Sequence, residues 1–387
     1  MNAAAADDGL DRAPPDPALG LFGALGEDGT IAPGFPGALD EALVLRMYRE
    51  MKRVRLLDQR MVLLQRQGRV GFYGACTGQE ASVVGAALAA SPDDWIFPAL
   101  RENAIMLVRG FSLSSFIAQI YGTASDSAKG RQMPNHVSSR SVHQVSWSSC
   151  VGTQLPHAVG AAWAAKLRGD RVVTLGFLGD GATSEADFHA ALNFAGVYQV
   201  PTVIICQNNH WAISVPLDRQ SASATLAIKA RAYGLPGVRV DGNDVIAVHH
   251  VLSEAIERAR AGGGPTFVEL VTYRIAPHST SDDPSRYRST DDVDSWARKD
   301  PLERFARYLR ARGIWKDEDE RSLDGEITEQ IAKAIAEVEL AGPPDRASLF
   351  EDVYANMPWH LAEQRAELEK TPPRKLPGGV ANQKDPR

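Results

Sequence analysis

Cysteine is scarce in this chain of 387 residues. Only Cys76, Cys150 and Cys206 occur, and their spacing matches no metal-ligand pattern. This usage is typical of proteins from a reducing compartment, where disulfides are rare. We therefore expect a cytoplasmic protein without a disulfide framework.

Long apolar runs and an excess of basic residues are also lacking. No stretch approaches the roughly 18 apolar residues of a transmembrane helix. The N-terminus has no basic region followed by an apolar core, and its acidic residues argue against a transit peptide. Since the net charge is −6, no basic face is expected to bind nucleic acid. The remaining composition, 44% hydrophobic and 23% charged, is ordinary for a globular protein with a large core.

The sequence pattern divides the chain into three parts: an N-terminal arm, a domain and a C-terminal segment. Residues 1–38 are rich in Ala, Gly, Pro and Asp and lack periodicity, which predicts a mobile arm that is either idle or wraps a partner chain. Residues 39–340 contain no linker-like segment, so we expect them to form one α/β domain. Residues 341–387 predict a C-terminal helical segment with a mobile tail from Thr371.

Helical patterns recur through the domain. Thr77 and Glu80 have the spacing of a capping box that would open one of these helices. Small residues on the helix expected from Cys150 would suit a close contact with a sheet or another subunit, or ordinary packing in the core. The expected helices are Glu41–Gln67, Ala81–Ala90, Cys150–Leu167, Leu226–Tyr233, Val245–Ala261, Pro301–Ala311, Leu323–Ala341 and Glu351–Lys370, the last broken near Pro358.

The segment from Val172 to Trp211 predicts a strand, a loop, a helix and a second strand. Asp180 ends the first apolar run and Asn209 ends the second. Parallel strands joined by a right-handed crossover place both carboxyl ends at one edge of a sheet, where ligands bind. A Mg²⁺ that also holds substrate phosphates takes such a sparse set of oxygen ligands. Asp180 and Asn209 are therefore candidate Mg²⁺ ligands.

Three further residues are candidates for the same edge. Arg101 lies at an expected strand-to-helix junction, which suits phosphate binding, although an ordinary salt bridge explains it equally well. His278 follows a strong expected strand, Thr266–Tyr273, and His136 lies in a polar loop of about 26 residues, a length that is usually functional or disordered.

Two other kinds of site compete for Asp180. A dinucleotide site needs G-x-G-x-x-G and an acidic residue on the second strand, but the loop reads GFLGDG and the second strand ends in two asparagines. A phosphatase with an aspartate nucleophile fits the strand end better, although no second nearby acid is apparent.

Several motifs together resemble one family. They are GFYGACTGQEA, GRQMP followed by His136, SSCVGTQ from Ser148, GDGATSEADFHAALNFAGVY, QNNHWAIS and PHSTSDDPSRYR. With G-D-G followed about 30 residues later by N-N, the chain from about Val44 to Leu368 resembles the alpha chains of heterotetrameric 2-oxo acid dehydrogenases. GRQMP-x-H, PHSTSDDPS and FEDVYANMPWHL look more like branched-chain than pyruvate members. The pyruvate and acetoin members stay as alternatives, as does a non-catalytic assembly subunit.

The resemblance implies a thiamine diphosphate-binding fold, a mostly parallel sheet flanked by helices. It implies Mg²⁺ bound by Asp180, Asn209 and the Trp211 carbonyl, and a catalytic pair, His278 and His136. The residues implied to contact the cofactor are Arg101, Ser149, Val151, Gly179, Asp180, Gly181, Ala182, Asn209, Trp211 and His278. Phe72 and Leu100 would line the acyl pocket, and Ser148, Cys150, Thr153 and Gln154 match a loop that K⁺ orders in some members.

The implied reaction is decarboxylation of a 2-oxo acid and transfer of the acyl group to a lipoyl group. The implied partners are a beta subunit, in an α₂β₂ assembly, and a lipoyl-bearing dihydrolipoyl acyltransferase. The glutamate that activates the cofactor belongs to the beta chain in this family, so this chain is expected to be inactive alone. The chain departs from the family at Leu100, where many members have tyrosine, and at Gln207, where animal branched-chain members have arginine. Ser279 matches a serine that animal members phosphorylate.

Overall fold

A five-stranded sheet lies at the centre of the molecule. The computed structural model describes residues 20–33, 35 and 40–372. All pairings in this sheet are parallel, in the order β1-β2-β3-β7-β6, which confirms the predicted α/β class. The strands are β1 (Trp95–Phe97), β2 (Thr174–Gly179), β3 (Thr202–Asn208), β6 (Gly237–Asp241) and β7 (Thr266–Val271), and a separate antiparallel pair is formed by β4 (Trp211–Ala212) and β5 (Val215–Pro216).

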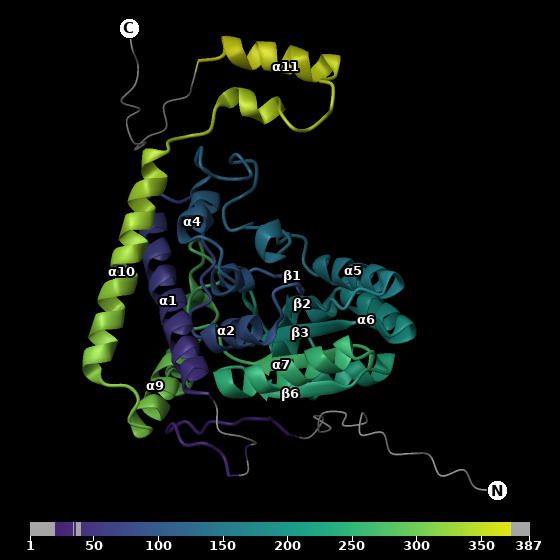
Figure 1. Ribbon diagram of the computed structural model, residues 1–387, viewed down its shortest axis with the longest axis vertical. Helices are drawn as coiled ribbons and strands as arrows, with labels where there is room; N and C mark the ends of the chain where they lie inside the picture. The colour runs from purple at the N-terminus through teal and green to yellow at the C-terminus, as the bar shows by residue number, and fades with distance from the viewer. Residues whose placement is uncertain (1–19, 34, 36–39, 373–387) are drawn as a thin grey trace, which may run out of the picture.

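Helices cover both faces of the sheet (Figure 1). On one face α5 (Gln154–Arg168) and α6 (Ala186–Tyr198) pack over the strands with Leu178, Ile204 and Phe267. On the other, α1 (Glu41–Arg66), α2 (Glu80–Ala89) and α7 (Val245–Arg260) cover a larger core that includes Phe177 and Ile205. Because alternate side chains of each strand enter opposite cores, the strands read as continuous apolar runs.

The other α-helices lie mainly around this layered body. They are α3 (Ile105–Val108), α4 (Leu113–Tyr121), α8 (Thr290–Ala297), α9 (Pro301–Ala311), α10 (Asp317–Leu340) and α11 (Trp359–Lys370). The 3₁₀ helices are η1 (Glu102–Ala104), η2 (Arg140–Val142), η3 (Asp180–Ser184), η4 (Leu217–Arg219), η5 (Ala227–Tyr233), η6 (Pro284–Arg286) and η7 (Arg346–Phe350).

The long first helix is confirmed. Asp40 caps α1 by accepting the Leu43 N–H at 3.1 Å, and one apolar face of the helix, which includes Met47 and Leu64, is buried. The prediction of a capping box at the start of α2 is wrong. The Thr77 hydroxyl donates to Asp58 at 3.1 Å, and the Glu80 carboxylate accepts from Gly78 N–H and pairs with Arg55 of α1. The ion pair between Glu80 and Arg55, a residue of another helix, thus replaces the local cap.

Four other helices differ from the prediction in type or by more than one residue. The α10 helix begins at Asp317, six residues before the expected Leu323. The α5 helix starts at Gln154, because Cys150 to Thr153 form a turn in which the Thr153 hydroxyl donates to the Cys150 carbonyl. The segment before Gly234 is a 3₁₀ helix. Helix over residues 351–358 is absent, and α11 begins only after Pro358.

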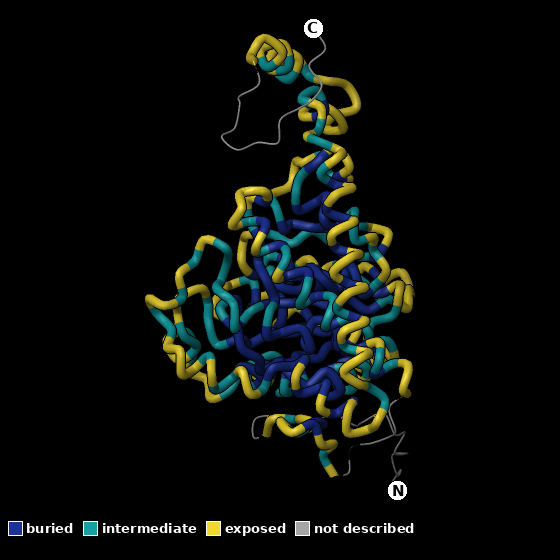
Figure 2. Tube along the Cα trace, turned by 90° about the vertical axis from the view of Figure 1, so that its left-hand side faces the viewer, coloured by how far each residue is buried: buried dark blue, intermediate teal, exposed yellow. Residues whose placement is uncertain are grey.

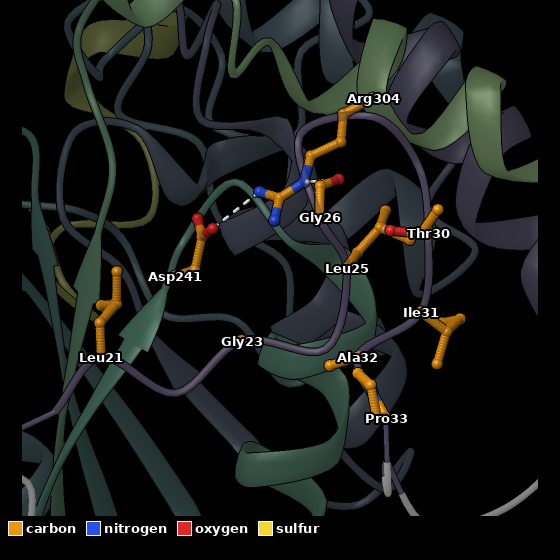
Figure 3. A pocket seen from close by; sticks show the side chains of 10 residues that line it. All are labelled: Leu21, Gly23, Leu25, Gly26, Thr30, Ile31, Ala32, Pro33, Asp241 and Arg304. Carbon is orange, nitrogen blue, oxygen red and sulfur yellow. Dashed lines mark hydrogen bonds and ion pairs between the residues drawn. The ribbon is translucent and has the colours of Figure 1, made fainter.

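Residues 20–33 lie against β6 and α9. Phe22 pairs with Val240 of β6, and the Asp244 carboxylate accepts the N–H groups of Ala24 and Leu25 at 2.7 and 2.6 Å. A cavity of about 320 Å³ lies between this segment and the ion pair of Arg304 with Asp241, as Figure 3 shows. The rest of the predicted arm, residues 1–19, 34 and 36–38, falls outside the described residues.

The C-terminal segment stands apart from the body. Figures 1 and 2 show α11 beyond the end of α10, and none of its residues is buried. The predicted tail lies outside the described residues from position 373 onward. Within the described part of the chain, no helix is long and apolar enough to cross a membrane.

Candidate functional site at the carboxyl edge of the sheet

The carboxyl ends of four strands bring the candidate residues together. Arg101 follows β1, Asp180 follows β2, Asn209 follows β3, and Arg274 follows β7. Gly179 of β2 pairs with Gln207 of β3, so the two middle strands end side by side. The Asn209 backbone N–H also hydrogen-bonds the Asp180 carboxylate. The expectation that Asp180 and Asn209 face one small volume is confirmed.

Asp180 is a buried carboxylate with neutral partners. Only 1% of the residue is exposed, and Oδ2 accepts from Gln220 Nε2 at 3.2 Å. Burial raises the pKa of this carboxyl to about 6. Nearby, Asn209 Oδ1 accepts the Trp211 N–H at 3.2 Å, and the Trp211 carbonyl accepts from Arg274 Nη1 at 3.3 Å. A carboxylate, an amide oxygen and a carbonyl therefore stand close together, the donor set of a hard divalent cation.

Two arginines are buried beside these oxygens without a carboxylate of their own. Arg274 is fully buried, and Arg101 is 7% exposed. Arg101 donates to the Ala75 carbonyl and to the His278 carbonyl at 2.9 Å. Arg274 donates to the Ile213 carbonyl at 2.5 Å and to the Tyr287 hydroxyl at 2.8 Å.

Neither guanidinium forms an ion pair among the residues that the structure describes. Burial and the nearby Arg274 lower the pKa of Arg101 to about 10, and burial also lowers the pKa of Arg274. Two buried charges of one sign are costly unless an anion joins them. This arrangement fits a diphosphate bound next to a cation.

His278 lies at the start of the loop after β7. Its backbone N–H donates to Asp282 Oδ2 at 2.7 Å, and its Nδ1 lies 3.5 Å from Arg101 Nη2. Asp282 also accepts from Tyr287, which links this loop to Arg274. Burial, followed by the charges of Arg101 and Arg274, lowers the pKa of His278 to about 4. The imidazole is therefore neutral near pH 7.

His136 forms a second group with residues of the long polar loop. Its Nε2 lies 2.8 Å from the Ser149 hydroxyl, and its ring centroid lies 4.1 Å from that of Trp147. Ser149 is exposed, and Val151 is 58% exposed, which is high for a valine. Among the described residues, no hydrogen bond joins this group directly to Asp180 or Asn209.

The remaining predicted residues lie around these two groups. Ser148 Oγ accepts the Cys150 N–H at 3.2 Å, and Gln154 Nε2 donates to the Phe177 carbonyl at 2.7 Å. The buried Oε1 of Gln154 has no partner in the described part of the chain.

The two residues expected to line the acyl pocket, Phe72 and Leu100, are both half-buried. A β-carbon placed on Gly74 would lie only 2.8 Å from Leu100 Cδ1, so the leucine packs directly on that glycine.

Arg274, Gln79 and Gln220 belong to the site but were not predicted. Arg274 follows β7 at the same edge as Asp180 and Asn209, so the rule that singled out those residues also applies to it. Gln79 and Gln220 reach the site only through tertiary contacts, and no local spacing indicates them.

Comparisons with known proteins identify the family of the chain. The model of the family described as "Dehydrogenase E1 component" matches residues 48–346. A 3-methyl-2-oxobutanoate dehydrogenase subunit alpha of Mycobacterium tuberculosis (strain ATCC 25618 / H37Rv) is 44% identical over 331 residues, covering 85% of this chain and 88% of that protein. The 2-oxoisovalerate dehydrogenase subunit alpha of Bos taurus is 40% identical over 333 residues, covering 86% and 73%. For subunit alpha 1 of Arabidopsis thaliana the identity is 40% over 360 residues, covering 92% and 76%. The chain therefore belongs to the dehydrogenase E1 component family, with alpha subunits of branched-chain 2-oxo acid dehydrogenases as its relatives.

Proposed function

We propose that this chain is the alpha subunit of an enzyme that decarboxylates branched-chain 2-oxo acids of the 2-oxoisovalerate type and transfers the acyl group to a lipoyl group. The observation that carries the proposal is the pair of buried arginines, Arg101 and Arg274, beside Asp180 and Asn209 at the carboxyl edge of the sheet. Family membership implies dependence on thiamine diphosphate, and an alpha subunit implies a beta subunit and an acyltransferase. The substrate class comes from the names of the relatives.

In this proposal the oxygen atoms of the site bind the metal ion and the two arginines bind the diphosphate. Asp180, Asn209 and the Trp211 carbonyl would hold Mg²⁺, since they offer oxygen atoms without a second carboxylate to compete with a diphosphate. Arg101 and Arg274 would bind the diphosphate, which supplies the negative charge that the two guanidinium groups lack. When bound, thiamine diphosphate supplies a thiazolium that accepts the electron pair left by decarboxylation.

The histidines would handle protons. His278 is neutral near pH 7, so it can accept a proton, and its backbone is fixed by Arg101 and Asp282. His136 is held by the Ser149 hydroxyl, which orients its ring nitrogen. The loop with Ser148, Cys150, Thr153 and Gln154 is the proposed K⁺ site, and the unpaired Gln154 Oε1 supports it.

Exposed apolar side chains on two neighbouring helices support the proposed contact with a beta subunit. The neighbouring helices α5 and α6 expose Leu167, Phe194 and Val197 by 73%, 40% and 68%, and small residues, including Gly160 and Ala164, are exposed on α5. Large apolar side chains with this exposure are typical of subunit interfaces. An α₂β₂ assembly would cover it and bring the second half of the catalytic machinery to the site.

A charge on this surface tests the interface. We expect Val197→Arg to reduce co-purification with the beta subunit, because assembly would bury the added guanidinium. Leu340→Arg, on the 89% exposed Leu340 of α10, is the matched control. Equal recovery of the beta subunit with both variants would contradict this placement of the interface.

The activity is tested on the assembly. The chain is produced together with a beta subunit from the same organism, and reduction of a dye acceptor is measured with 2-oxoisovalerate, pyruvate and acetoin. We expect the highest kcat/KM for 2-oxoisovalerate. A preference for pyruvate or acetoin would move the chain to those members of the family. No dye reduction with any of the three would refute the dehydrogenase proposal, and phosphate ester hydrolysis would then favour the phosphatase.

A further inference from the structure

Gln79 lies directly behind the proposed metal ligand Asn209. It is the residue that precedes α2, and its side chain is fully buried. Its Oε1 accepts two hydrogen bonds, from Asn209 Nδ2 at 3.1 Å and from Gln207 Nε2 at 3.0 Å. Both donors belong to the end of β3, and both residues are at least nine-tenths buried. One carboxamide oxygen therefore connects the start of α2 with the end of β3.

These contacts determine which atom of the Asn209 carboxamide can face a cation. Nδ2 points to Gln79, while Oδ1 accepts the Trp211 N–H at 3.2 Å. Rotation of the carboxamide by half a turn would place an NH₂ group against the Trp211 N–H and an oxygen against the Gln79 oxygen. Both contacts would be repulsive, so the observed orientation is fixed from two sides. Oδ1 keeps a second lone pair, which is available to a cation.

The arrangement leaves other polar atoms without partners. Gln79 Nε2 and Gln207 Oε1 are buried and form no hydrogen bond with any residue that the structure describes. Unpaired buried polar atoms reduce stability, so these glutamines are poorly explained as contributors to the fold alone. Gln207 stands at the position where animal branched-chain members have arginine, and here its amide group is directed at Gln79 instead.

We propose that Gln79 is a positioning residue for the metal site: its Oε1 holds the Asn209 carboxamide so that Oδ1 faces the cation. The inference rests on the proposed function, since it takes Asn209 and Asp180 as metal ligands. Groups that orient metal ligands typically account for a 10- to 100-fold difference in metal affinity. Gln79 touches no substrate in this scheme and acts only through Asn209.

The test measures Mn²⁺ affinity rather than turnover. The assembly of this chain with its beta subunit is titrated with Mn²⁺ at saturating thiamine diphosphate, and free Mn²⁺ is followed by electron paramagnetic resonance. Gln79→Met keeps the side-chain length but removes the acceptor, and we expect the dissociation constant to rise 10- to 100-fold. Gln79→Glu keeps an oxygen that accepts both N–H groups, so we expect affinity close to that of the unmodified protein.

Two controls separate the possible causes. Gln119→Met removes another buried carboxamide, which bonds Ser127 and Ser138 but neither Asp180 nor Asn209, and should leave Mn²⁺ affinity unchanged. Asp180→Asn removes the charged ligand and should abolish tight binding.

The outcomes separate the positioning role from the metal site itself. Unchanged affinity in Gln79→Met, together with loss in Asp180→Asn, would overturn the role of Gln79 and leave the metal site standing. Unchanged affinity in both variants would overturn the metal site itself. A similar loss in Gln79→Met and Gln119→Met, or a 10- to 100-fold loss in Gln79→Glu, would also refute positioning by the oxygen acceptor.

Discussion

Replacing Arg101 by lysine tests whether the proposed diphosphate site needs a guanidinium or only a positive charge. Arginine has five N–H donors and lysine has three. Arg101 directs one donor to the Ala75 carbonyl and one to the His278 carbonyl, which leaves up to three for an anion. A lysine that kept both carbonyl contacts would have one donor left. The variant therefore loses up to two charge-assisted hydrogen bonds to the diphosphate.

The loss of one such bond sets the lower limit of the effect. A hydrogen bond to a charged group contributes about 1.5–3 kcal/mol, so Arg101→Lys should raise the dissociation constant of thiamine diphosphate roughly 10- to 150-fold. Isothermal titration calorimetry of the assembly at saturating Mg²⁺ measures this constant. Equal affinities in Arg101→Lys and the unmodified protein would refute the reasoning and leave a role for charge alone.

A matched variant controls for the loss of a guanidinium that is held by carbonyl groups. Arg109 also donates only to carbonyls, those of Ser91, Pro92, Asp94 and Val142. Arg109→Lys should lower the midpoint of thermal unfolding without changing cofactor affinity. If it weakened the cofactor as much as Arg101→Lys does, the effect of Arg101→Lys would have to be assigned to general destabilisation.

Two further predictions concern the loop after β2 and the histidine after β7. Gly181→Ala should lower the free energy of unfolding by about 1–3 kcal/mol, because the new methyl group would lie 2.5 Å from Ala212 Cβ. Gly179→Ala, with no atom within 4 Å of the new group, should leave it unchanged in urea unfolding; equal losses would contradict the close approach. Since the pKa of His278 is lowered to about 4, the unfolded state binds a proton between pH 6.5 and 4 that the folded state does not, so stability falls as the pH falls through this window. In His278→Gln, the free energy of unfolding should fall less between pH 7 and 5 than in the unmodified protein. The control His360→Gln, at an exposed position, should behave like the unmodified protein. Identical pH profiles of stability for all three proteins would contradict the lowered pKa.

The parallel sheet could be predicted from the sequence because its strands are buried on both faces. The apolar runs before Asp180 and Asn209 are continuous for this reason, and the polar residue that ends each run marks the carboxyl edge of the sheet. The same rule applies to Arg274, three residues beyond β7, but a single arginine in a strand-like segment does not stand out in the sequence.

Features that depend on distant partners could not be predicted. The Thr77 and Glu80 pair has the spacing of a cap, but Arg55 of α1 takes the Glu80 carboxylate. The local pattern around Thr77 contains no information about Arg55, which lies in another helix. Gln79 precedes Asn209 by 130 residues and meets it only in the folded sheet, so its contact with the site required the tertiary structure.

If they bind the diphosphate as proposed, the two buried guanidinium groups would connect cofactor supply with the lifetime of the protein. Their repulsion weakens the folded state in the absence of an anion, and a bound diphosphate would remove that repulsion. A ligand that binds only the folded state stabilises it by RT ln(1 + [L]/Kd), about 2.7 kcal/mol when its concentration is 100 times Kd. Under the proposed function, subunits made when thiamine is scarce would unfold more often and be degraded faster, so the amount of enzyme in the cell would follow the vitamin without a dedicated regulator.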